Sequence, residues 1–306
     1  MIPTVLMICR LDGYANSARP KKMIEWLKNQ NIKVDILNTL QSPLKIEQEF
    51  NTAMPGKNTN FKLKDKCIEI IKSIFFNILF FPYLKNNAKK LYSFLKDKYY
   101  DTIICVNSID AFVFLYDFDC IRIYDCPTPW ADEQYYGKKI SKKNYQKLLN
   151  YEIEIYKNVD HVCFNWETYK EYTKKYYNGD NLFTLNWGCD PKEKNQLAEY
   201  NEKPKIVFMG FLDGYWSNIP LLSKLSKLYE IDVYGGPKPP KKLGLNYKGY
   251  ATPEILSNYQ FGLITISDDD LRKEGFSAKH LEYINYGLPV LIPEWRKNLH
   301  LIEGSI

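Results

Sequence analysis

Short apolar runs alternate with longer amphipathic stretches along the chain, and the alternation starts again in the second half. Apolar runs rich in β-branched residues indicate buried strands, and the stretches between them have helical periodicity. This alternation predicts an α/β fold with parallel sheets covered by helices on both faces. The predicted strands are Thr4–Cys9, Lys33–Leu37, Thr102–Val106, Ile121–Tyr124, His161–Phe164, Leu182–Leu185, Ile206–Met209, Ile231–Tyr234, Tyr247–Tyr250 and Gly262–Ile266.

Helices are expected between most of these strands. Pro20 is expected in the first turn of its helix, where its missing N–H costs nothing. Thr252 followed by Pro253 has the pattern of an N-cap and a first helical residue. The predicted helices are Pro20–Gln30, Lys64–Phe80, Leu84–Lys98, Lys142–Lys157, Trp166–Tyr177, Pro220–Leu228 and Pro253–Asn258.

A polar segment bounded by prolines, 190–204, separates the two rounds of alternation and is predicted to be an interdomain linker. A chain of 306 residues is long enough for two domains. We therefore expect two Rossmann-like domains, 1–189 and 205–306, that face each other across a cleft.

The segment from Glu274 to Pro293, E-G-F-S-A-K-H-L-E-Y-I-N-Y-G-L-P-V-L-I-P, has the pattern of loop, helix, glycine turn and buried strand. Ser277 is the expected N-cap, so a phosphate could bind the free amides of Ala278 and Lys279. Glu282 lies further along the helix and could bind a ribose hydroxyl. The segment therefore predicts a nucleotide-sugar pocket.

The same segment has a plainer interpretation. An amphipathic helix could pack Leu281 and Ile284 inward and leave both glutamates in solvent. Paired glutamates at this spacing also arise by chance in a glutamate-rich sequence.

Several further segments resemble GT-B glycosyltransferases, most closely the group that includes glycosyltransferase family four. The resemblance is strong only in the second half, and it implies a nucleotide diphosphate sugar as donor substrate, with no cofactor and no metal. The matching segments are C-I-R-I-Y-D-C-P-T-P-W-A-D-E, Y-K-N-V-D-H-V-C-F-N-W, L-F-T-L-N-W-G-C-D-P, K-I-V-F-M-G-F-L-D and the stretch that begins at Glu274.

Carried over by position, the resemblance assigns a donor site to the second domain. Glu274 would lie beside the sugar, and Glu282 would bind the ribose. The remaining donor contacts would be Gly210, Phe211, Gly249, Tyr250, Ala251, Gly275, Phe276, Ser277 and Ala278.

One position departs from the family. The family usually has an arginine after the glycine that ends the first donor-domain strand, whereas here Phe211 follows Gly210. A leaving diphosphate needs charge compensation, so either Lys279 and Arg272 supply it or turnover is weak.

In the first domain the resemblance places the loop after Thr4–Cys9 between donor and acceptor. Asp12 could act as a base in an inverting reaction. The alternatives are an ordinary loop capped by Asn16 or Ser17 and, for Trp130, a place in the core. The acceptor-side residues are Gly13, Tyr14, Asn16, Arg19, Asp125 and Trp130.

These features predict a hexosyltransferase that adds a sugar to a glycan or lipid-linked acceptor during surface-polysaccharide assembly, with retention favoured over inversion. The alternative is a catalytically weak GT-B subunit that binds a glycan or a partner transferase. A nicotinamide dehydrogenase is poorly supported because no G-x-G-x-x-G follows the first strand. The seven cysteines contain no C-x-x-C pair, so neither zinc nor a disulfide framework is expected.

Residues 57–98 contain ten lysines against three acidic residues and enclose an apolar run. This pattern is typical of a segment that binds an anionic membrane, with Phe75, Phe76, Phe80 and Phe81 dipping into the headgroups. The alternative is a core helix with solvated lysines. No recognition motif suggests nucleic acid. We expect a cytoplasmic protein that is peripheral at the membrane. The second domain is either shortened at its end or closed in a different way.

Overall fold

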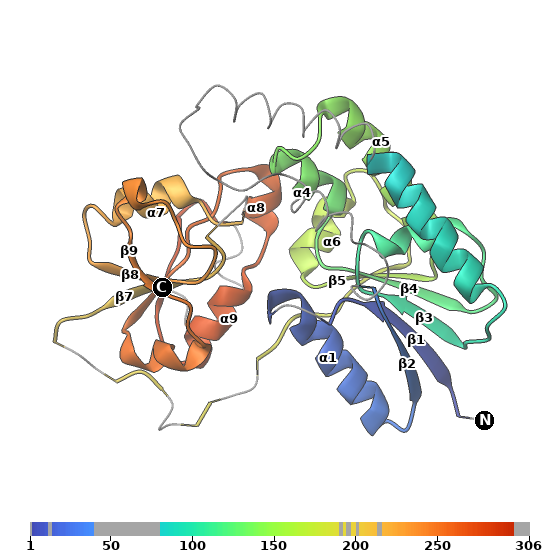
Figure 1. The fold of residues 1–306 in the computed structure, drawn as a ribbon, viewed down its shortest axis with the longest axis horizontal. Helices are drawn as coiled ribbons and strands as arrows, with labels where there is room; N and C mark the ends of the chain where they lie inside the picture. Colours follow the sequence, from blue (N-terminus) through green and yellow to red (C-terminus); the bar gives the residue numbers. More distant parts are fainter. Residues whose placement is uncertain are drawn as a thin grey trace, which may run out of the picture. The chain divides into compact units, whose positions relative to one another are not determined.

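A computed structural model of the chain describes residues 2–11, 14–39, 80–189, 192–193, 197–199, 202–212 and 216–296, with side chains omitted at 14–18. The chain divides into two compact units, Met1–Leu185 and Asn186–Ile306. Both contain a parallel sheet with helices, so the predicted α/β class with two Rossmann-like domains is confirmed (Figure 1).

The first unit is built on six parallel strands in the order β2-β1-β3-β4-β5-β6. The order reverses between β1 and β3, because β2 lies on one side of β1 and all later strands lie on the other. The strands are β1 (Thr4–Cys9), β2 (Lys33–Asn38), β3 (Thr102–Cys105), β4 (Ile121–Cys126), β5 (His161–Phe164) and β6 (Leu182–Thr184).

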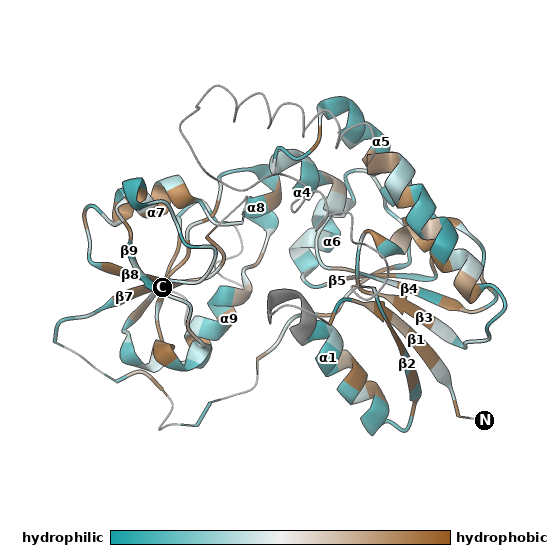
Figure 2. Ribbon diagram, viewed as in Figure 1, coloured by the Kyte–Doolittle hydropathy of each residue, from teal (hydrophilic) through white to brown (hydrophobic). Residues whose placement is uncertain are grey.

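Helices cover both faces of this sheet, with α1 on one side and α5 together with the helical residues 80–95 on the other (Figure 1). The apolar colouring in Figure 2 follows the strands, and the outer faces of the helices are hydrophilic. The elements are α1 (Tyr14–Asn29), the 3-10 helix η1 (Asp110–Leu115), α4 (Trp130–Tyr136), α5 (Lys142–Asn158) and α6 (Glu167–Thr173).

The second unit has five parallel strands in the order β11-β10-β7-β8-β9. Its strands are β7 (Ile206–Met209), β8 (Ile231–Tyr234), β9 (Asn246–Gly249), β10 (Phe261–Leu263) and β11 (Val290–Leu291). Its helices are α7 (Ile219–Leu225), the 3-10 helices η3 (Lys241–Leu243) and η4 (Pro253–Asn258), α8 (Asp270–Glu274) and α9 (Ala278–Asn285).

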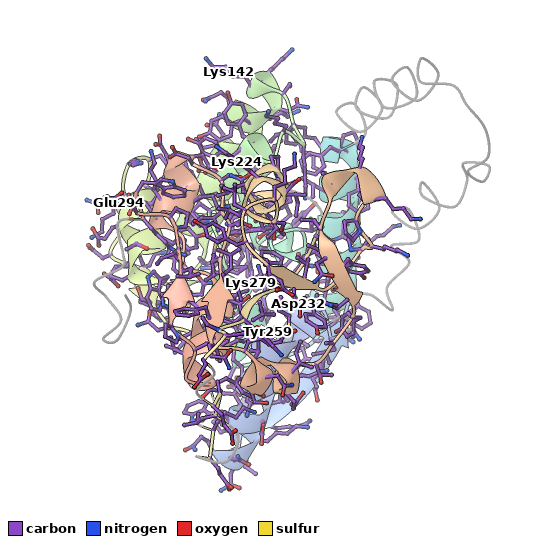
Figure 3. All side chains as sticks on the ribbon, turned by 90° about the vertical axis from the view of Figure 1, so that its left-hand side faces the viewer. Lys142, Lys224, Asp232, Tyr259, Lys279 and Glu294 are labelled. Atoms are coloured by element: carbon purple, nitrogen blue, oxygen red, sulfur yellow. The ribbon has the colours of Figure 1, made fainter. Side chains whose placement is uncertain are left out.

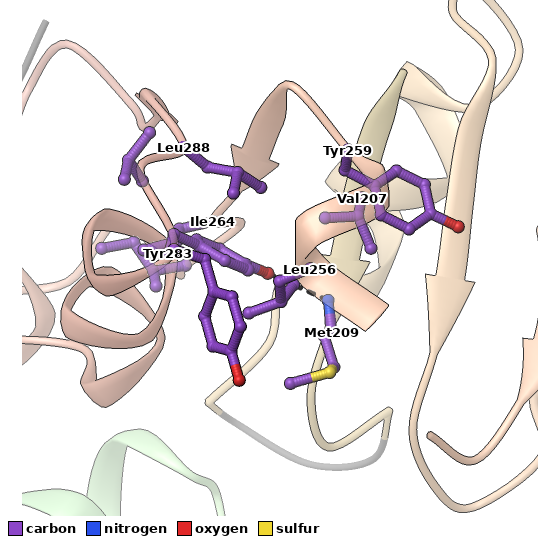
Figure 4. Close-up of a cluster of buried hydrophobic side chains, with 10 residues drawn as sticks. Val207, Met209, Leu256, Tyr259, Ile264, Tyr283 and Leu288 are labelled. Atoms are coloured by element: carbon purple, nitrogen blue, oxygen red, sulfur yellow. Dashed lines mark hydrogen bonds between the residues drawn. The ribbon is translucent and has the colours of Figure 1, made fainter. Parts of the chain in front are cut away.

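The strand β7 separates two buried clusters in this unit because its side chains alternate between the faces. Val207 and Met209 pack with Tyr283 of α9 (Figure 4). Phe208 packs on the other face with Leu222 of α7. The sheet is therefore a core layer between two layers of helix, as expected for a parallel sheet.

The differences from the predicted elements lie mainly at their ends. The helix α1 begins at Tyr14, so Pro20 lies inside it instead of in its first turn. The short helices α4 and α8 and the 3-10 helix η1 were not predicted, because segments of five to seven residues carry too little periodicity. The expected helix at 64–80 lies almost wholly outside the described residues.

The predicted membrane contact of Phe80 and Phe81 is wrong. Phe80 and Phe81 were expected to dip into lipid headgroups, but they are only 6% and 4% exposed. Phe80 packs against Trp130 with ring centroids 5.8 Å apart, and Phe81 packs against Tyr151 at 5.9 Å. Both therefore belong to the buried face of the helical residues 80–95, together with Leu84, Ala88 and Leu91. Phe75 and Phe76 lie outside the described residues.

Candidate donor site

The strand order of the second unit also reverses, between β10 and β7. In open α/β sheets, ligands bind outside the carboxyl ends of the strands at such a reversal. Gly210 follows β7 directly at this place, and α9 begins after β10 and α8. The sheet topology therefore places the predicted donor residues of the second unit at the edge where a ligand is expected.

Lys279 and Gly210 are in direct contact at this edge. A Cβ atom added to Gly210 would lie 2.0 Å from Cε of Lys279 and 2.9 Å from its Nζ. The Nζ atom also lies 5.6 Å from the ring centre of Phe208. The glycine thus provides the space that the lysine side chain occupies, which explains why this position carries no side chain.

The electrostatics around Lys279 are unusual for a lysine. Burial and, to a smaller extent, the charge of Arg272 lower its pKa to about 8 against the opposing charge of Glu282. Burial raises the pKa of Glu282, and Lys279 opposes this. Arg272 is itself 2% exposed and lies against the ring of Trp216. Two cations therefore share a poorly hydrated region next to one carboxylate (Figure 3 labels Lys279).

Tyr283 fixes the position of the helix that carries Lys279 and Glu282. The residues Lys279 and Tyr283 are four apart and so share one face of α9. The Tyr283 hydroxyl accepts a hydrogen bond from the Met209 amide at 2.9 Å and donates one to the Leu263 carbonyl at 3.3 Å (Figure 4). The helix is thereby bonded to β7 and β10 at the point where the strand order reverses.

Close backbone packing joins the ends of β7, β8 and β9. Gly235 has φ of +124°, and a Cβ atom there would lie in contact with the carbonyl oxygen of Gly210. The Gly235 amide donates to the Gly249 carbonyl at 2.9 Å. Gly249 itself has φ of +104°, a conformation that favours glycine. The predicted donor residues Gly210 and Gly249 are thus brought together through a glycine that was not predicted.

The loop between α8 and α9 consists of Gly275, Phe276 and Ser277. Ser277 occupies the predicted N-cap position of α9, but its side chain makes no capping hydrogen bond. Phe276 stacks on His280 with ring centroids 5.2 Å apart and an angle of 18° between the rings. Arg296, which follows β11, donates a hydrogen bond to the Gly275 carbonyl.

The remaining predicted donor residues are half-buried or exposed. Glu274 ends α8 and is half-buried, as are Ala278 and Ala251. Phe211 and Tyr250 are 60% and 67% exposed. Both side chains are therefore open to a ligand, while their contacts with a donor stay predictions.

In the first unit, two predicted acceptor-side residues form a buried ion pair. Nε and Nη2 of Arg19 donate to the two Asp125 carboxylate oxygens at 2.7 and 2.8 Å. Nη1 of Arg19 donates to the Leu185 carbonyl at 3.0 Å. Since Asp125 is fully buried, the pair holds α1, β4 and the chain after β6 together.

Trp130 lies in an aromatic cluster with Phe80 and Phe112 and is 9% exposed. This is the core position that the sequence left open as an alternative, and an acceptor contact stays a prediction. Tyr14 and Asn16 lie in the first turn of α1. Asp12 and Gly13 lie outside the described residues.

Two residues of this region were missed. Gly235 could have been found, because G-G-P after a predicted strand marks a turn. Arg296 gave no signal in the sequence, since its partner lies more than twenty positions earlier. Over the described ranges, no group of three or more His, Cys, Asp or Glu is placed to hold a metal ion. None of the helices described there is both long and apolar enough to cross a membrane.

No protein-family model matches the sequence, and no curated protein matches it. Solved structures do match. The lipopolysaccharide outer core galactosyltransferase WaaB is 12% identical with a TM-score of 0.58, over 94% of this chain and 80% of that chain. Sucrose-phosphate synthase from Thermosynechococcus elongatus is also 12% identical, with a TM-score of 0.59 and the same coverage of both chains. An alpha-glucosyltransferase in complex with UDP-glucose and DNA is 10% identical with a TM-score of 0.51, over 97% of this chain and 81% of that chain. The chain therefore has the GT-B fold.

Proposed function

We propose that this protein is a glycosyltransferase that moves a hexose from a nucleoside diphosphate sugar to a glycan or lipid-linked acceptor. The observation that carries the proposal is the placement of Lys279 against Gly210, beside the buried Arg272, at the carboxyl end of β7. This is the position at which the departing diphosphate of a GT-B donor needs positive charge.

The charge arrangement supports a diphosphate in particular. Two neighbouring cations repel each other in a poorly hydrated region, where electrostatic interactions are stronger than in water. A ligand with two negative groups would offset this repulsion. The adjacent Glu282 is partly buried, and this burial raises its pKa, so it is not an ordinary surface carboxylate. Its oxygens are suited to accept hydrogen bonds from ribose hydroxyls.

In the proposed reaction, an acceptor hydroxyl oxygen forms a bond to the anomeric carbon, and the bond from that carbon to the diphosphate breaks. The diphosphate leaves with the electron pair, and its released oxygen takes the proton of the acceptor hydroxyl. Lys279 and Arg272 stabilise the charge on the leaving diphosphate, and Glu274 lies beside the sugar. We propose retention of configuration; with inversion, Asp12 would take the proton.

The donor panel should consist of the UDP, GDP and ADP sugars of common hexoses, with binding measured by thermal shift and calorimetry. A ligand that binds only the folded state raises its apparent stability. We expect one nucleotide class to bind and to support transfer, and Lys279→Ala to lower turnover far more than folding stability. Failure of every donor to bind would refute the proposal. Binding without turnover would instead favour a catalytically weak subunit.

We propose that the protein binds an anionic membrane through a lysine cluster at the start of α5, as a role in surface-polysaccharide assembly at the cytoplasmic face would require. No acidic residue lies between Glu133 and Glu152, and α5 has no acidic residue in its first turn. Cations at a helix N-terminus oppose the helix dipole, so this cluster stabilises the helix poorly. The exposed lysines are Lys138, Lys139, Lys142, Lys143 and Lys147 (Figure 3 labels Lys142).

This cluster is a better candidate for an anionic membrane than the buried phenylalanines. Lysines near an anionic surface contribute about 1 kcal/mol each. We expect co-sedimentation with vesicles containing anionic lipid, lost with neutral vesicles or at high salt. Replacement of four cluster lysines by glutamine should abolish the co-sedimentation, and the four are Lys138, Lys139, Lys142 and Lys143. The matched replacement of four other exposed lysines, Lys224, Lys227, Lys241 and Lys242, should not. Equal binding by both variants would refute this surface.

A further inference from the structure

We infer that Arg296 is a positioning residue for the donor loop. From its place after the edge strand β11, it holds the backbone of Gly275, Phe276 and Ser277 in position. This rests on the proposed function, because the loop is the one assigned to the donor sugar and phosphates. Arg296 follows β11 and is only 2% exposed, so its guanidinium is committed to the interior.

The contacts of Arg296 converge on this loop. Its Nη2 donates to the carbonyl of Gly275, the C-cap residue that follows α8. Carbonyls at a helix end lack intrahelical partners, and a basic side chain can satisfy them. The guanidinium carbon also lies 5.7 Å from the ring centre of Phe276, within the range of a cation–π contact. One side chain thus holds two consecutive loop residues.

The loop transmits this placement into α9. The Phe276 ring stacks on His280, and the His280 amide donates to the Ser277 carbonyl at 2.9 Å. Lys279 precedes His280 directly, so the first turn of α9 and its lysine depend on the path of the loop.

Lysine should replace Arg296 poorly. The planar guanidinium can donate to a carbonyl and lie beside an aromatic ring at the same time, whereas an ammonium acts as a point charge. A misplacement of about 1 Å far from the reacting atoms can cost about 100-fold in rate. We therefore expect Arg296→Lys to be only partly functional and Arg296→Met to be worse.

The test combines a functional and a local measurement on the full chain. Wild type, Arg296→Lys, Arg296→Met and the control Arg122→Met are titrated with UDP, GDP and ADP, and with the sugar donor of the tightest one. We expect Arg296→Met to weaken donor binding roughly 10- to 100-fold, with kcat/KM falling alike, and Arg122→Met to leave both unchanged. Equal affinities for wild type and both Arg296 variants overturn the inference.

The local measurement follows the histidines by NMR, which is practical because the chain has three. Burial, together with the charge of Arg296, lowers the pKa of His280 to about 4. Arg296→Met should raise this pKa, and Arg296→Lys should raise it less. An unchanged His280 titration would show that Arg296 does not hold the loop. If wild type binds no nucleotide at all, the proposed function fails, and the role at a donor loop fails with it.

Discussion

Gly210→Ala tests whether the space beside β7 exists for Lys279. The new Cβ would lie 2.0 Å from Cε of Lys279, so the lysine must leave its position. The glycine does not have a positive φ, so alanine brings no backbone strain. Because the displaced atoms are the end of a flexible side chain, folding stability should change by less than about 1 kcal/mol.

The cost should appear in ligand binding. A hydrogen bond to a charged group contributes about 1.5–3 kcal/mol, which corresponds to roughly 10- to 150-fold in affinity. Isothermal titration calorimetry with the preferred nucleoside diphosphate measures this directly, and chemical denaturation measures the stability. Gly188→Ala is the matched control, because a Cβ there meets nothing within 4 Å.

A double mutant identifies the cause. If alanine at 210 acts by displacing Lys279, then Gly210→Ala combined with Lys279→Ala should bind no more weakly than Lys279→Ala alone. The reasoning is refuted if Gly210→Ala binds like wild type, or if its loss remains undiminished when Lys279 is already alanine.

Three further predictions concern single groups. Glu282→Ala should weaken nucleotide binding by about 1.5–3 kcal/mol with the fold intact, and unchanged calorimetric affinity would remove Glu282 from the ribose. The pKa of Lys279 is lowered to about 8, so the lysine loses its charge above that pH. Nucleotide affinity measured from pH 7 to 9 should therefore fall by up to about tenfold per pH unit above 8. Lys279→Arg stays charged and should show no such fall. Phe80→Ala should destabilise folding by about 3–5 kcal/mol in urea denaturation, whereas the half-exposed Phe94→Ala should cost under about 1 kcal/mol; similar values for the two would contradict the core position of Phe80.

The strands were predictable because buried parallel strands have a strong local pattern. Thr4–Cys9, Ile206–Met209 and Ile231–Tyr234 form at their predicted bounds. Gly287, predicted as the glycine that ends α9, has φ of +77°. Short helices such as α8 lack enough residues for a periodic signal, and its capping residue Asp269 lies in a run of aspartates that also suits a loop.

The candidate site was predictable only where its partners are close in sequence. The spacing of Lys279 and Glu282 on one helix follows from helical geometry. The contact between Lys279 and Gly210 and the hydrogen bond from Arg296 to Gly275 depend on strand order, which no local pattern encodes. Likewise Arg19 and Asp125 were each singled out, but their pairing with each other was not foreseen.

The hydroxyl of Tyr283 between β7 and β10 limits how the candidate donor site can move. Gly262 leaves room for its ring, since a Cβ there would lie 2.3 Å from it. Because the Tyr283 hydroxyl accepts a hydrogen bond from the Met209 amide and donates one to the Leu263 carbonyl, α9 cannot slide or tilt without breaking bonds to the sheet. Any closure of the second unit around a donor that keeps these bonds must therefore leave α9 fixed to the sheet, and the amide of Met209 should exchange with solvent as slowly as those of the sheet interior.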